Sequence, residues 1–326
     1  NRALVVSEKR TYKIVNDIPY PVLKSADEII ISNRAVGLNP IDWKSVEFNF
    51  CLPEFPWITG REVAGVVKAI GANVKELKVG DRVWASTYYR DRRAGCFQQY
   101  VAVPQHTVTR IPDNLDFESA SCLGVAGLTA AMTLWKWLDV PIGSVSRLPA
   151  PSSIEYIVIW GGSTVTGQFA IQIAIQSGLH VIAVASEKTR PLVLSLGATR
   201  VVTRDGKTND EIVSEIRTLG GDNITRAVDL VGAETAKFCL ELFSTTKPGL
   251  FAPLAMISSD TYIPENIKVK SVEMKQFILN PESKIYATEL NRLVSDGLVI
   301  MPTIEVLNGG LDSIESGLER LKRSDM

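Results

Sequence analysis

Residues 156–167 read Tyr-Ile-Val-Ile-Trp-Gly-Gly-Ser-Thr-Val-Thr-Gly, and this stretch decides the fold. Its first five residues are all apolar, which predicts a strand buried on both faces, and helical spacing follows over Gly167–Ser177. A glycine-rich turn between a buried strand and a helix is typical of dinucleotide binding, because N–H groups at the helix start face the pyrophosphate. The spacing is not Gly-x-Gly-x-x-Gly, so the turn alone is also compatible with simple packing.

Strands and helices alternate after this turn, which predicts right-handed crossovers and a parallel sheet. The predicted strands are Val181–Ala185, Arg200–Thr203, Ala227–Val231 and Gly249–Met256. The predicted helices are Thr189–Leu196, Glu211–Thr218 and Thr235–Phe243. The sequence therefore predicts an α/β fold with a doubly wound, Rossmann-type sheet.

The first third of the chain instead predicts a β-barrel of short strands separated by turns. Its strands are Glu28–Gly37, Glu62–Gly71, Asp81–Ala85 and Gln98–Val103, and Gly65 predicts a bulge or close backbone approach. A helix is expected over Phe117–Leu138 with Asp116 as its N-cap, and 141–153 is expected to be a loop. The tail predicts one long amphipathic helix from about Lys275, a strand-like Thr303–Leu307 and a short helix at Leu311–Lys322.

These patterns place the domain limits at 124/125 and 272/273. Residues 1–124 would form the first part of a β-rich substrate and catalytic domain, 125–272 the cofactor domain, and 273–326 the return to the first domain. A chain of 326 residues is long enough for two such domains.

Composition and charge exclude several classes of function. The net charge of −1 leaves no basic excess to hold a nucleic acid backbone. Unbroken apolar runs are strand-sized and fall short of the ~20 residues that span a bilayer, so no membrane association is expected. The chain opens on a strand-like run instead of a signal-peptide pattern, and a cytoplasmic location is the default expectation.

Metal chemistry is not expected either. The four cysteines, Cys51, Cys96, Cys122 and Cys239, include no Cys-x-x-Cys pair, and His106 and His180 are the only histidines. A zinc site needs about three or four convergent protein ligands. We therefore interpret the cysteines as buried, inert thiols and the histidines as surface residues without a catalytic role.

The residues after the second predicted strand indicate which dinucleotide binds. Ser186 and Lys188 suit a ribose 2′-phosphate, and Arg204 would lie at the same corner. Glu187 is the contrary signal, since NAD sites place an acid there. We predict NADPH, held by the turn residues Ser163, Thr164, Val165 and Thr166 and by the corner residues Ser186, Glu187, Lys188, Thr189 and Arg204, although the charges are also compatible with a solvated loop.

Motifs along the whole chain resemble those of the medium-chain dehydrogenase/reductase superfamily. They are Val36-Gly-Leu-Asn-Pro-Ile-Asp-Trp-Lys44, Thr59-Gly-Arg-Glu-Val-Ala-Gly-Val-Val67, Gly80-Asp-Arg-Val-Trp-Ala85, Gly95-Cys-Phe-Gln-Gln-Tyr100, Gly127-Leu-Thr-Ala-Ala131, the Gly161–Gly167 turn, Leu196-Gly-Ala198 and Val228-Asp-Leu-Val-Gly232. The resemblance implies a GroES-like β-barrel domain interrupted by a Rossmann domain.

Zinc alcohol dehydrogenases of that family carry a Cys near Asn39–Asp42 and a His at Arg61, so both ligands are missing here. The chain is more similar to the zinc-independent quinone and enoyl reductases. Its Asn-Pro-Ile-Asp-Trp-Lys and Trp-Gly-Gly-Ser-Thr motifs, and the Pro-rich stretch before Tyr156, resemble fungal trans-acting enoyl reductases of polyketide biosynthesis. That resemblance implies hydride transfer from NADPH to an α,β-unsaturated thioester, with a polyketide synthase as a candidate partner.

The resemblance also implies the site residues. Lys44 and Thr129 would act near the nicotinamide as catalytic residues, although a surface lysine and an ordinary helix residue fit the sequence as well. Ile41, Asp42, Trp43, Val306 and Leu307 would contact the cofactor, with Asp42 holding its loop instead of titrating. Thr129, Ala130, Phe251 and Leu254 would contact the substrate.

Two other functions remain open from the sequence. The chain could be a free-standing quinone or enone reductase acting on small molecules. It could also be a nucleotide-binding scaffold without catalysis, which would bind NADPH and consume no enone, quinone or enoyl thioester.

Overall fold

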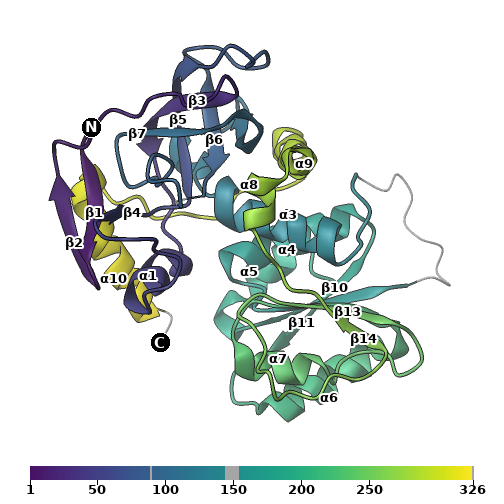
Figure 1. Ribbon diagram of the computed structural model, residues 1–326. Helices are drawn as coiled ribbons and strands as arrows, with labels where there is room; N and C mark the ends of the chain where they lie inside the picture. The colour runs from purple at the N-terminus through teal and green to yellow at the C-terminus, as the bar shows by residue number, and fades with distance from the viewer. Residues whose placement is uncertain (89, 144–153, 325–326) are drawn as a thin grey trace. The chain divides into compact units, whose positions relative to one another are not determined.

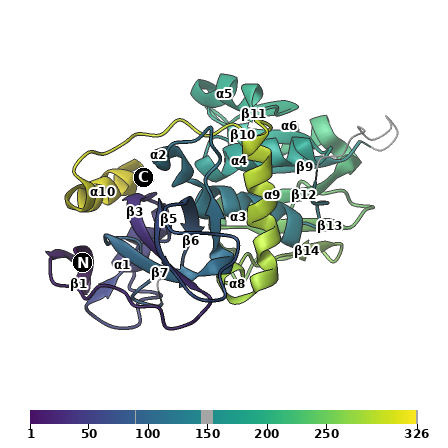
Figure 2. The same ribbon diagram turned by 90° about the horizontal axis from the view of Figure 1, so that it is seen from above.

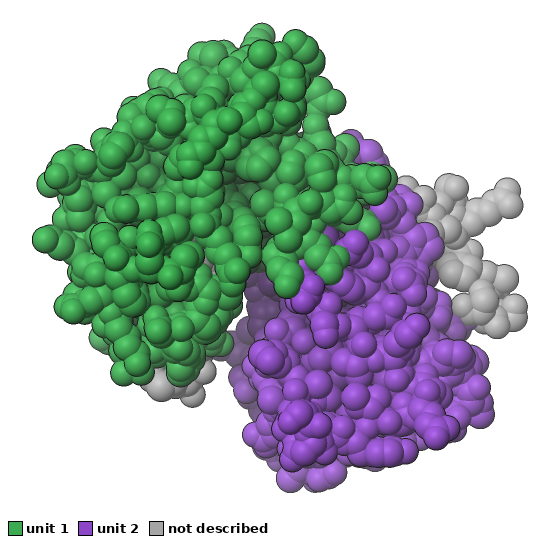
Figure 3. Space-filling view, in the orientation of Figure 1, with its two compact units in different colours: residues 1–128, 275–291, 303–326 green, residues 129–274, 292–302 purple. Residues whose placement is uncertain are grey.

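The computed structural model describes residues 1–88, 90–143 and 154–324. The chain divides into two compact units, one of residues 1–128, 275–291 and 303–326, the other of residues 129–274 and 292–302 (Figure 3). This division puts 292–302 with the second unit, although the sequence analysis assigned all of 273–326 to the first; the predicted limits at 124/125 and 272/273 stay predictions. Most of the expected loop at 141–153 lies outside the described residues.

The second unit is built on one sheet of six parallel strands in the order β11-β10-β9-β12-β13-β14, which Figure 2 shows by its labels. The strands are β9 (Tyr156–Trp160), β10 (His180–Ala185), β11 (Arg200–Thr203), β12 (Ile224–Asp229), β13 (Gly249–Pro253) and β14 (Ile267–Val269). This is the order of a doubly wound dinucleotide-binding sheet, whose ligands lie outside the carboxyl ends of the strands.

Helices cover both faces of this sheet, α4 and α5 on one and α6 and α7 on the other (Figure 1). They are α4 (Val165–Gln176), α5 (Arg190–Ser195) with η5 (Glu187–Thr189) before it, α6 (Asn209–Gly220) followed by η6 (Gly221–Asn223), and α7 (Ala233–Cys239). The face under α6 and α7 buries one apolar cluster, in which Ile216 and Cys239 meet Val184 and Phe251. Burial on both sides explains why β9 and all of β10 after His180 are apolar, whereas the edge strands β11 and β14 also carry polar residues.

The first unit contains two antiparallel sheets, ordered β7-β3-β5-β6-β8 and β2-β1-β4. The strands are β1 (Ala3–Glu8), β2 (Thr11–Val15), β3 (Glu28–Ala35), β4 (Trp57–Ile58), β5 (Glu62–Ile70), β6 (Arg82–Ser86), β7 (Tyr100–Pro104) and β8 (Val108–Arg110). The pairing register shifts beside Gly65, where a Cβ would lie 2.3 Å from the carbonyl oxygen of Ser32. The predicted bulge and close approach at Gly65 are therefore confirmed.

Short helices complete this unit. They are α1 (Pro40–Glu47), η1 (Gln105–Thr107), α2 (Phe117–Ala120), η2 (Leu123–Gly127), α8 (Lys275–Leu279), η7 (Pro281–Ser283), η8 (Gly310–Ser313) and α10 (Ile314–Ser324). Figure 1 shows α10 beside α1, and Ile314 and Leu318 of α10 pack with Ile58, Phe97 and the β1 residues in one core cluster. The C-terminal helix is thus part of the core that carries α1.

Two expectations for the tail are wrong. Pro281 ends the predicted long helix at α8, because proline cannot continue a helical hydrogen-bond ladder, and α9 (Lys284–Ser295) follows. Thr303–Leu307 forms no strand, since its backbone pairs with no neighbouring strand in the described chain. The helix expected at Leu311–Lys322 is present as η8 and α10.

The helical stretch Phe117–Trp137 continues from α2 and η2 into α3 (Leu128–Met132) and η3 (Thr133–Trp137), with π-helical turns at η2 and η3. Asp116 caps it as expected, accepting the Ser119 N–H at 2.7 Å. Among the described residues it is the one helical stretch long and apolar enough to cross a membrane, but 72% of its most apolar window is buried in the protein. That burial is the property of a core helix, and such a helix is weak evidence for a membrane span.

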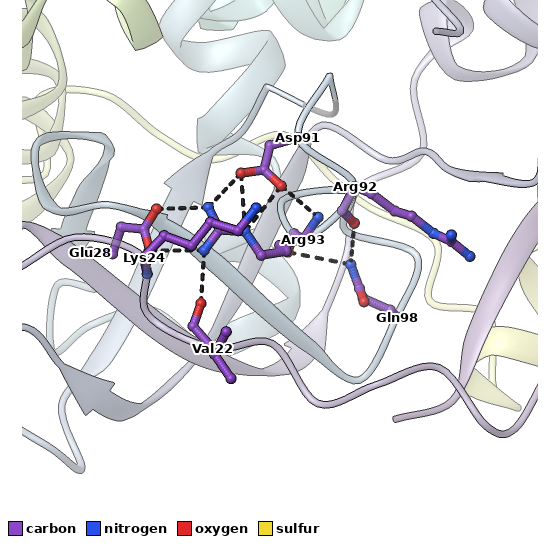
Figure 4. A network of polar contacts seen from close by, with 7 residues as sticks. All are labelled: Val22, Lys24, Glu28, Asp91, Arg92, Arg93 and Gln98. Atoms are coloured by element: carbon purple, nitrogen blue, oxygen red, sulfur yellow. Dashed lines mark hydrogen bonds and ion pairs between the residues drawn. The ribbon is translucent and has the colours of Figure 1, made fainter. Parts of the chain in front are cut away.

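A charge network ties the loop before β7 to the start of β3 (Figure 4). The Arg93 guanidinium donates two hydrogen bonds to the Glu28 carboxylate, at 2.8 and 2.9 Å, and also binds Asp91 and the Val22 carbonyl. These bonds hold the pKa of Glu28 below its ordinary value. Bidentate arginine–carboxylate pairs are strong and directional, so this network fixes the loop on the barrel sheet.

Candidate active site

The glycine turn joins β9 to α4 through backbone geometry that its glycines permit. Gly161 has φ of +96°, and a Cβ on Gly167 would lie 2.4 Å from the Gly161 carbonyl oxygen. The N–H groups of Gly161 and Gly162 both donate to the Val184 carbonyl, at 3.1 and 2.9 Å. The turn is therefore fastened to β10, and its own glycine N–H groups are already used.

The backbone N–H groups at the start of α4 are available to a ligand. Thr164 is the N-cap, and its hydroxyl accepts the Gly167 N–H at 3.0 Å. The first N–H groups of a helix have no partner within it, which leaves those of Val165 and Thr166 for solvent or an anion. Val165 is 41% exposed, so the helix start is accessible. With the helix dipole, this end of a 12-residue helix suits a pyrophosphate.

The corner after β10 is held by its own hydroxyl groups. Ser186 caps η5, its hydroxyl lying 2.9 Å from that of Thr189 and accepting the Thr189 N–H. The Arg204 N–H donates to the Ala185 carbonyl at 3.0 Å, which brings the end of β11 beside the end of β10. The Lys188 and Arg204 side chains are both exposed at this corner. The structure thus brings together the residues that the sequence predicted for a ribose phosphate.

Asp205 is a residue of this corner that the sequence analysis missed. Its carboxylate accepts the Glu187 N–H at 2.6 Å, while the exposed Glu187 side chain pairs with Arg190 at 3.7 Å. The Asp205 carboxylate therefore fixes the backbone of the corner, and the Glu187 carboxylate forms an ion pair with Arg190. The signal in the sequence was the Arg-Asp-Gly turn directly after β11, which places Asp205 at the same sheet edge.

Lys44 lies on α1, not in the loop that the sequence analysis expected. Pro40 occupies the first helical turn, where its missing N–H costs nothing, so Asn39-Pro40 begins a helix instead of preventing one. The Lys44 ammonium lies 5.3 Å from the centre of the Trp43 ring, and Lys322 of α10 lies 5.7 Å from it. The Trp43 ring thus makes cation–π contacts with Lys44 and Lys322, within the segment 41–44 that is predicted to lie near the nicotinamide.

Asp42 holds the start of this helix, whereas the sequence analysis expected it to hold a loop and not to titrate. Its carboxylate accepts the Asn39 backbone N–H at 2.9 Å. Asp42 is only 1% exposed, and burial raises its pKa to about 6 despite the nearby Arg61. Its second carboxyl oxygen has no hydrogen-bond partner among the described residues, which agrees with a carboxyl that resists ionisation.

Glu62, the first residue of β5, was not singled out from the sequence for any role. Its side chain is 2% exposed, and burial raises its pKa to about 8. One carboxyl oxygen accepts the Asn39 side-chain amide at 2.6 Å, and the other accepts the Val125 N–H at 2.6 Å. The neighbouring Arg61 donates to the Ser45 hydroxyl on α1 at 3.2 Å. Among the described residues, no three His, Cys, Asp or Glu side chains are grouped to hold a metal ion.

The other predicted residues are scattered over the two units. Thr129 is half-buried and Ala130 is buried in α3, and Leu254 follows β13. Phe251 is fully buried and packs edge-on against Phe243, so it is a core residue and its assignment to the substrate is corrected. In the first unit Val306 is 52% exposed, whereas Leu307 packs against α10 at Gly317.

The cysteines and histidines differ in part from expectation. Cys96 and Cys239 are buried free thiols whose pKa burial raises, but Cys51 is exposed. His106 is half-buried, with a ring nitrogen 2.9 Å from the Ile278 carbonyl oxygen, and His180 lies against Tyr156 with ring centres 5.5 Å apart. Both histidines are therefore partly buried, and their lack of a catalytic role stays a prediction.

Comparisons with known proteins agree with this architecture. Residues 25–113 match the alcohol dehydrogenase GroES-like domain, and residues 166–295 match the zinc-binding dehydrogenase domain. The trans-enoyl reductase himH of Aspergillus japonicus is 32% identical over 305 residues, covering 91% of this chain and 86% of its own length. The predicted GroES-like domain and Rossmann sheet are thus confirmed.

Solved structures share the whole fold. The CurK enoyl reductase matches with a TM-score of 0.81 at 20% identity, covering 99% of this chain and 96% of that chain. The Escherichia coli quinone oxidoreductase complexed with NADPH matches with a TM-score of 0.77 at 20% identity, covering 99% and 97%. At such identities the match establishes the fold.

Proposed function

Because the chain belongs to the medium-chain dehydrogenase/reductase family, in the branch of the trans-enoyl reductases, we propose that it is an NADPH-dependent enoyl reductase. Its substrate would be the α,β-unsaturated thioester of a polyketide intermediate, reduced in trans to a polyketide synthase in the cytoplasm. The observation that carries this proposal is the 32% identity to a trans-enoyl reductase over 91% of the chain.

The second unit has groups that fit the dinucleotide. The start of α4, with Ser163, Thr164, Val165 and Thr166, would hold the pyrophosphate by N–H groups and the helix dipole. Ser186, Lys188, Thr189 and Arg204 would hold the ribose 2′-phosphate, where a hydroxyl donor and two exposed cations are available. The exposed Glu187 carboxylate lies 3.7 Å from the Arg190 guanidinium, and this pairing favours NADPH over NADH because it reduces the negative charge at the corner.

When bound, the cofactor would supply the hydride for the β-carbon of the enoyl group. The chain's own residues would then place the reactants and stabilise negative charge on the thioester oxygen. We assign these roles to Lys44 on α1 and Thr129 on α3, with Ile41–Trp43, Val306 and Leu307 near the nicotinamide and Ala130 and Leu254 near the substrate. Such a reaction needs no nucleophilic side chain.

Zinc would take no part in this reaction. The two positions where zinc alcohol dehydrogenases carry ligands hold Asp42, which caps α1, and Arg61, which binds Ser45. A guanidinium is permanently charged and is no metal ligand, so this donor set does not suit zinc.

The test is a screen of NADPH oxidation with enoyl thioesters, simple enones and quinones as alternative acceptors. The proposal expects turnover of the enoyl thioester with the highest kcat/KM, and none in the absence of acceptor. Turnover of quinones alone would identify a quinone reductase instead. Binding of NADPH without turnover of any acceptor would identify a nucleotide-binding scaffold.

A further inference from the structure

Glu62 is a buried carboxyl that the proposed reaction does not use. It begins β5 in the first unit and is 2% exposed, although a glutamate is almost never fully buried without a partner. Both of its oxygens accept short hydrogen bonds, each at 2.6 Å. A carboxyl held in this way has a fixed position, and it fixes the groups that bind it.

Its two partners come from the two segments proposed to carry the active residues. The Asn39 side-chain amide belongs to the N-cap residue of α1, the helix of Lys44. The Val125 N–H belongs to the π-helical turn η2, which runs directly into α3, the helix of Thr129. These partners lie 23 and 63 residues from Glu62 in the chain. One carboxyl therefore connects the starts of both segments.

The Glu62 side chain is closely packed against the backbone of Gly37 and Gly124. A Cβ on Gly37 would lie 2.0 Å from a Glu62 carboxyl oxygen, and a Cβ on Gly124 would lie 2.7 Å from its Cβ. Two glycines thus give this side chain its space, one just before α1 and one within η2. Displacement of the carboxyl would move both segments, because close-packed interiors have little free volume.

We propose that Glu62 is a positioning residue, whose carboxyl sets the start of α1, and hence Lys44, and the η2 turn that leads to Thr129. This rests on the proposed function for the roles of Lys44 and Thr129. The hydrogen bonds themselves are independent of it, since they join β5, α1 and η2 within one unit.

The asparagine–glutamate contact allows a rescue experiment. Asn39→Asp keeps a good helix N-cap but sets a second carboxyl against Glu62 in place of a donor. In the double variant Asn39→Asp/Glu62→Gln, the introduced amide at position 62 donates to the introduced carboxylate at position 39. The oxygen of that amide still accepts the Val125 N–H. The contact is thereby restored with its polarity reversed.

For the single variant Asn39→Asp, assayed above pH 8 where Glu62 is ionised, we expect kcat on the enoyl thioester to fall about ten- to a hundredfold, since small misplacements of catalytic groups have effects of this size. KM for NADPH should change little, because the adenosine-binding residues lie on other elements. The double variant should recover kcat to within about threefold of the unchanged protein. The loss in Asn39→Asp should be smaller near neutral pH and greatest at alkaline pH, where Glu62 ionises beside the Asp42 carboxylate and the introduced carboxyl, while the buried Cys96 and Cys122 thiols stay neutral and Arg61 is the nearby cation.

Glu28→Gln is the matched control. Glu28 also begins a strand of the same unit and is bound through both oxygens, but its partners are Arg93 and the Lys24 N–H in the network of Figure 4. It should lower the melting temperature and leave kcat of the folded protein unchanged. A fall in kcat as large as that of Asn39→Asp would show that any lost carboxyl contact in this unit has the same effect, and would overturn the specific role of Glu62.

Hydrogen exchange tests the positioning without any activity. Asn39→Asp should speed amide exchange in residues 40–47 and 123–127, the double variant should reverse it, and Glu28→Gln should speed exchange around 90–98 instead. Unchanged exchange in both segments, or recovery of exchange without recovery of kcat, would overturn the proposal. If the unchanged protein reduces no enoyl thioester but the exchange pattern is as expected, the proposed function fails and the role of Glu62 in holding α1 and η2 stands.

Discussion

Individual buried carboxyl groups make the free energy of unfolding of this chain depend on pH. Glu62 has a pKa raised by burial from 4.5 to about 8, so between these values the folded chain binds a proton that the unfolded chain has released. The free energy of unfolding must therefore fall as pH rises through this window. Asp42 and Asp229 act in the same direction, but only up to about pH 6.

We predict that Glu62→Gln flattens the pH dependence of stability between pH 6 and pH 8, where the other two carboxyls have already ionised. A full proton of difference corresponds to about 1.4 kcal/mol per pH unit. Urea titrations at several pH values measure the slope, with Glu28→Gln as a control that should keep it. An identical slope in Glu62→Gln and the unchanged protein would mean that Glu62 is ionised throughout.

A second residue-scale prediction concerns the cofactor. Lys188→Ala should weaken NADPH binding by roughly ten- to a hundredfold, because a lost charge-assisted contact costs ~1.5–3 kcal/mol. NADH binding should barely change, and Arg200→Ala, at the exposed amino end of β11, serves as a control for the loss of a cation from this unit. Equal affinities for NADPH and NADH in the unchanged protein would show that Glu187 or Asp205 contacts the ribose instead.

Lys44 and Thr129 are tested by removing their polar groups. Thr129→Val keeps the volume and should slow turnover roughly three- to a hundredfold, as expected for one lost hydrogen bond to a neutral or charged group. Lys44→Ala should lose at least as much, since a cation near developing negative charge acts strongly in a low-dielectric site. Steady-state kinetics with thermal melts provide the measurement. Wild-type rates and melting temperatures in both variants would identify the two residues as scaffold.

The sequence predicted site residues that follow a strand directly and missed those defined by distant contacts. Ser186, Lys188 and Arg204 could be predicted because the carboxyl ends of parallel strands share one edge. The role of Glu62 could not, since its partners Asn39 and Val125 become neighbours only when the barrel and two helices pack. Phe251 was misassigned because an apolar residue at a strand end fits a core and a pocket equally well.

At the scale of elements, the sequence predicted β9 and β11 at their observed bounds. The buried β9 is a short unbroken apolar run, whereas only the two valines of β11 are apolar and its place follows from the alternation of strands and helices. Helix α1 was missed because residues 39–44 were expected to form a loop, although proline is favoured at a helix start. The three-residue β14 was missed as well, since so short a strand has no pattern of its own and forms only by pairing with β13. Local sequence patterns thus predict elements whose own residues favour the structure, and they miss elements such as β14 that form only by pairing with a distant strand.

The turn between β9 and α4 supplies an element-scale prediction. Gly167→Ala places a Cβ 2.4 Å from the Gly161 carbonyl oxygen, so α4 must move away from the turn. We expect a destabilisation of about 1–3 kcal/mol and weaker NADPH binding, because the helix start no longer faces the same point. Gly232→Ala is the control, since nothing lies within 4 Å of a Cβ there. Equal stability and affinity in the two variants would contradict the close approach of α4 to β9.

At the scale of the whole molecule, the family shares its fold with zinc enzymes, so metal content is a direct test of the branch. We predict that the purified protein contains no stoichiometric zinc and keeps its activity in the presence of chelators, because Asp42 and Arg61 are engaged with α1. Metal analysis and chelator-treated assays measure this. One zinc per chain together with activity abolished by chelation would overturn the proposed mechanism.

Because the chain has two compact units, we also predict that the dinucleotide stabilises one unit more than the other. The proposed pyrophosphate and 2′-phosphate groups all lie in the second unit, at α4 and after β10 and β11. A ligand at about one hundred times its Kd adds about 2.7 kcal/mol to the unfolding of whatever binds it. Saturating NADP⁺ should therefore raise the thermal transition of the second unit, and NAD⁺ at the same concentration should raise it less.

Calorimetry of the full chain measures both transitions, since a two-unit protein need not unfold in a single step. Glu28→Gln identifies the transition of the first unit, because the Arg93 network that it weakens lies wholly there. The transition that this variant leaves unchanged should be the one that NADP⁺ raises. Equal shifts with NADP⁺ and NAD⁺ would contradict the role of Ser186, Lys188 and Arg204, and a shift confined to the first unit would contradict the assignment of the dinucleotide to the parallel sheet.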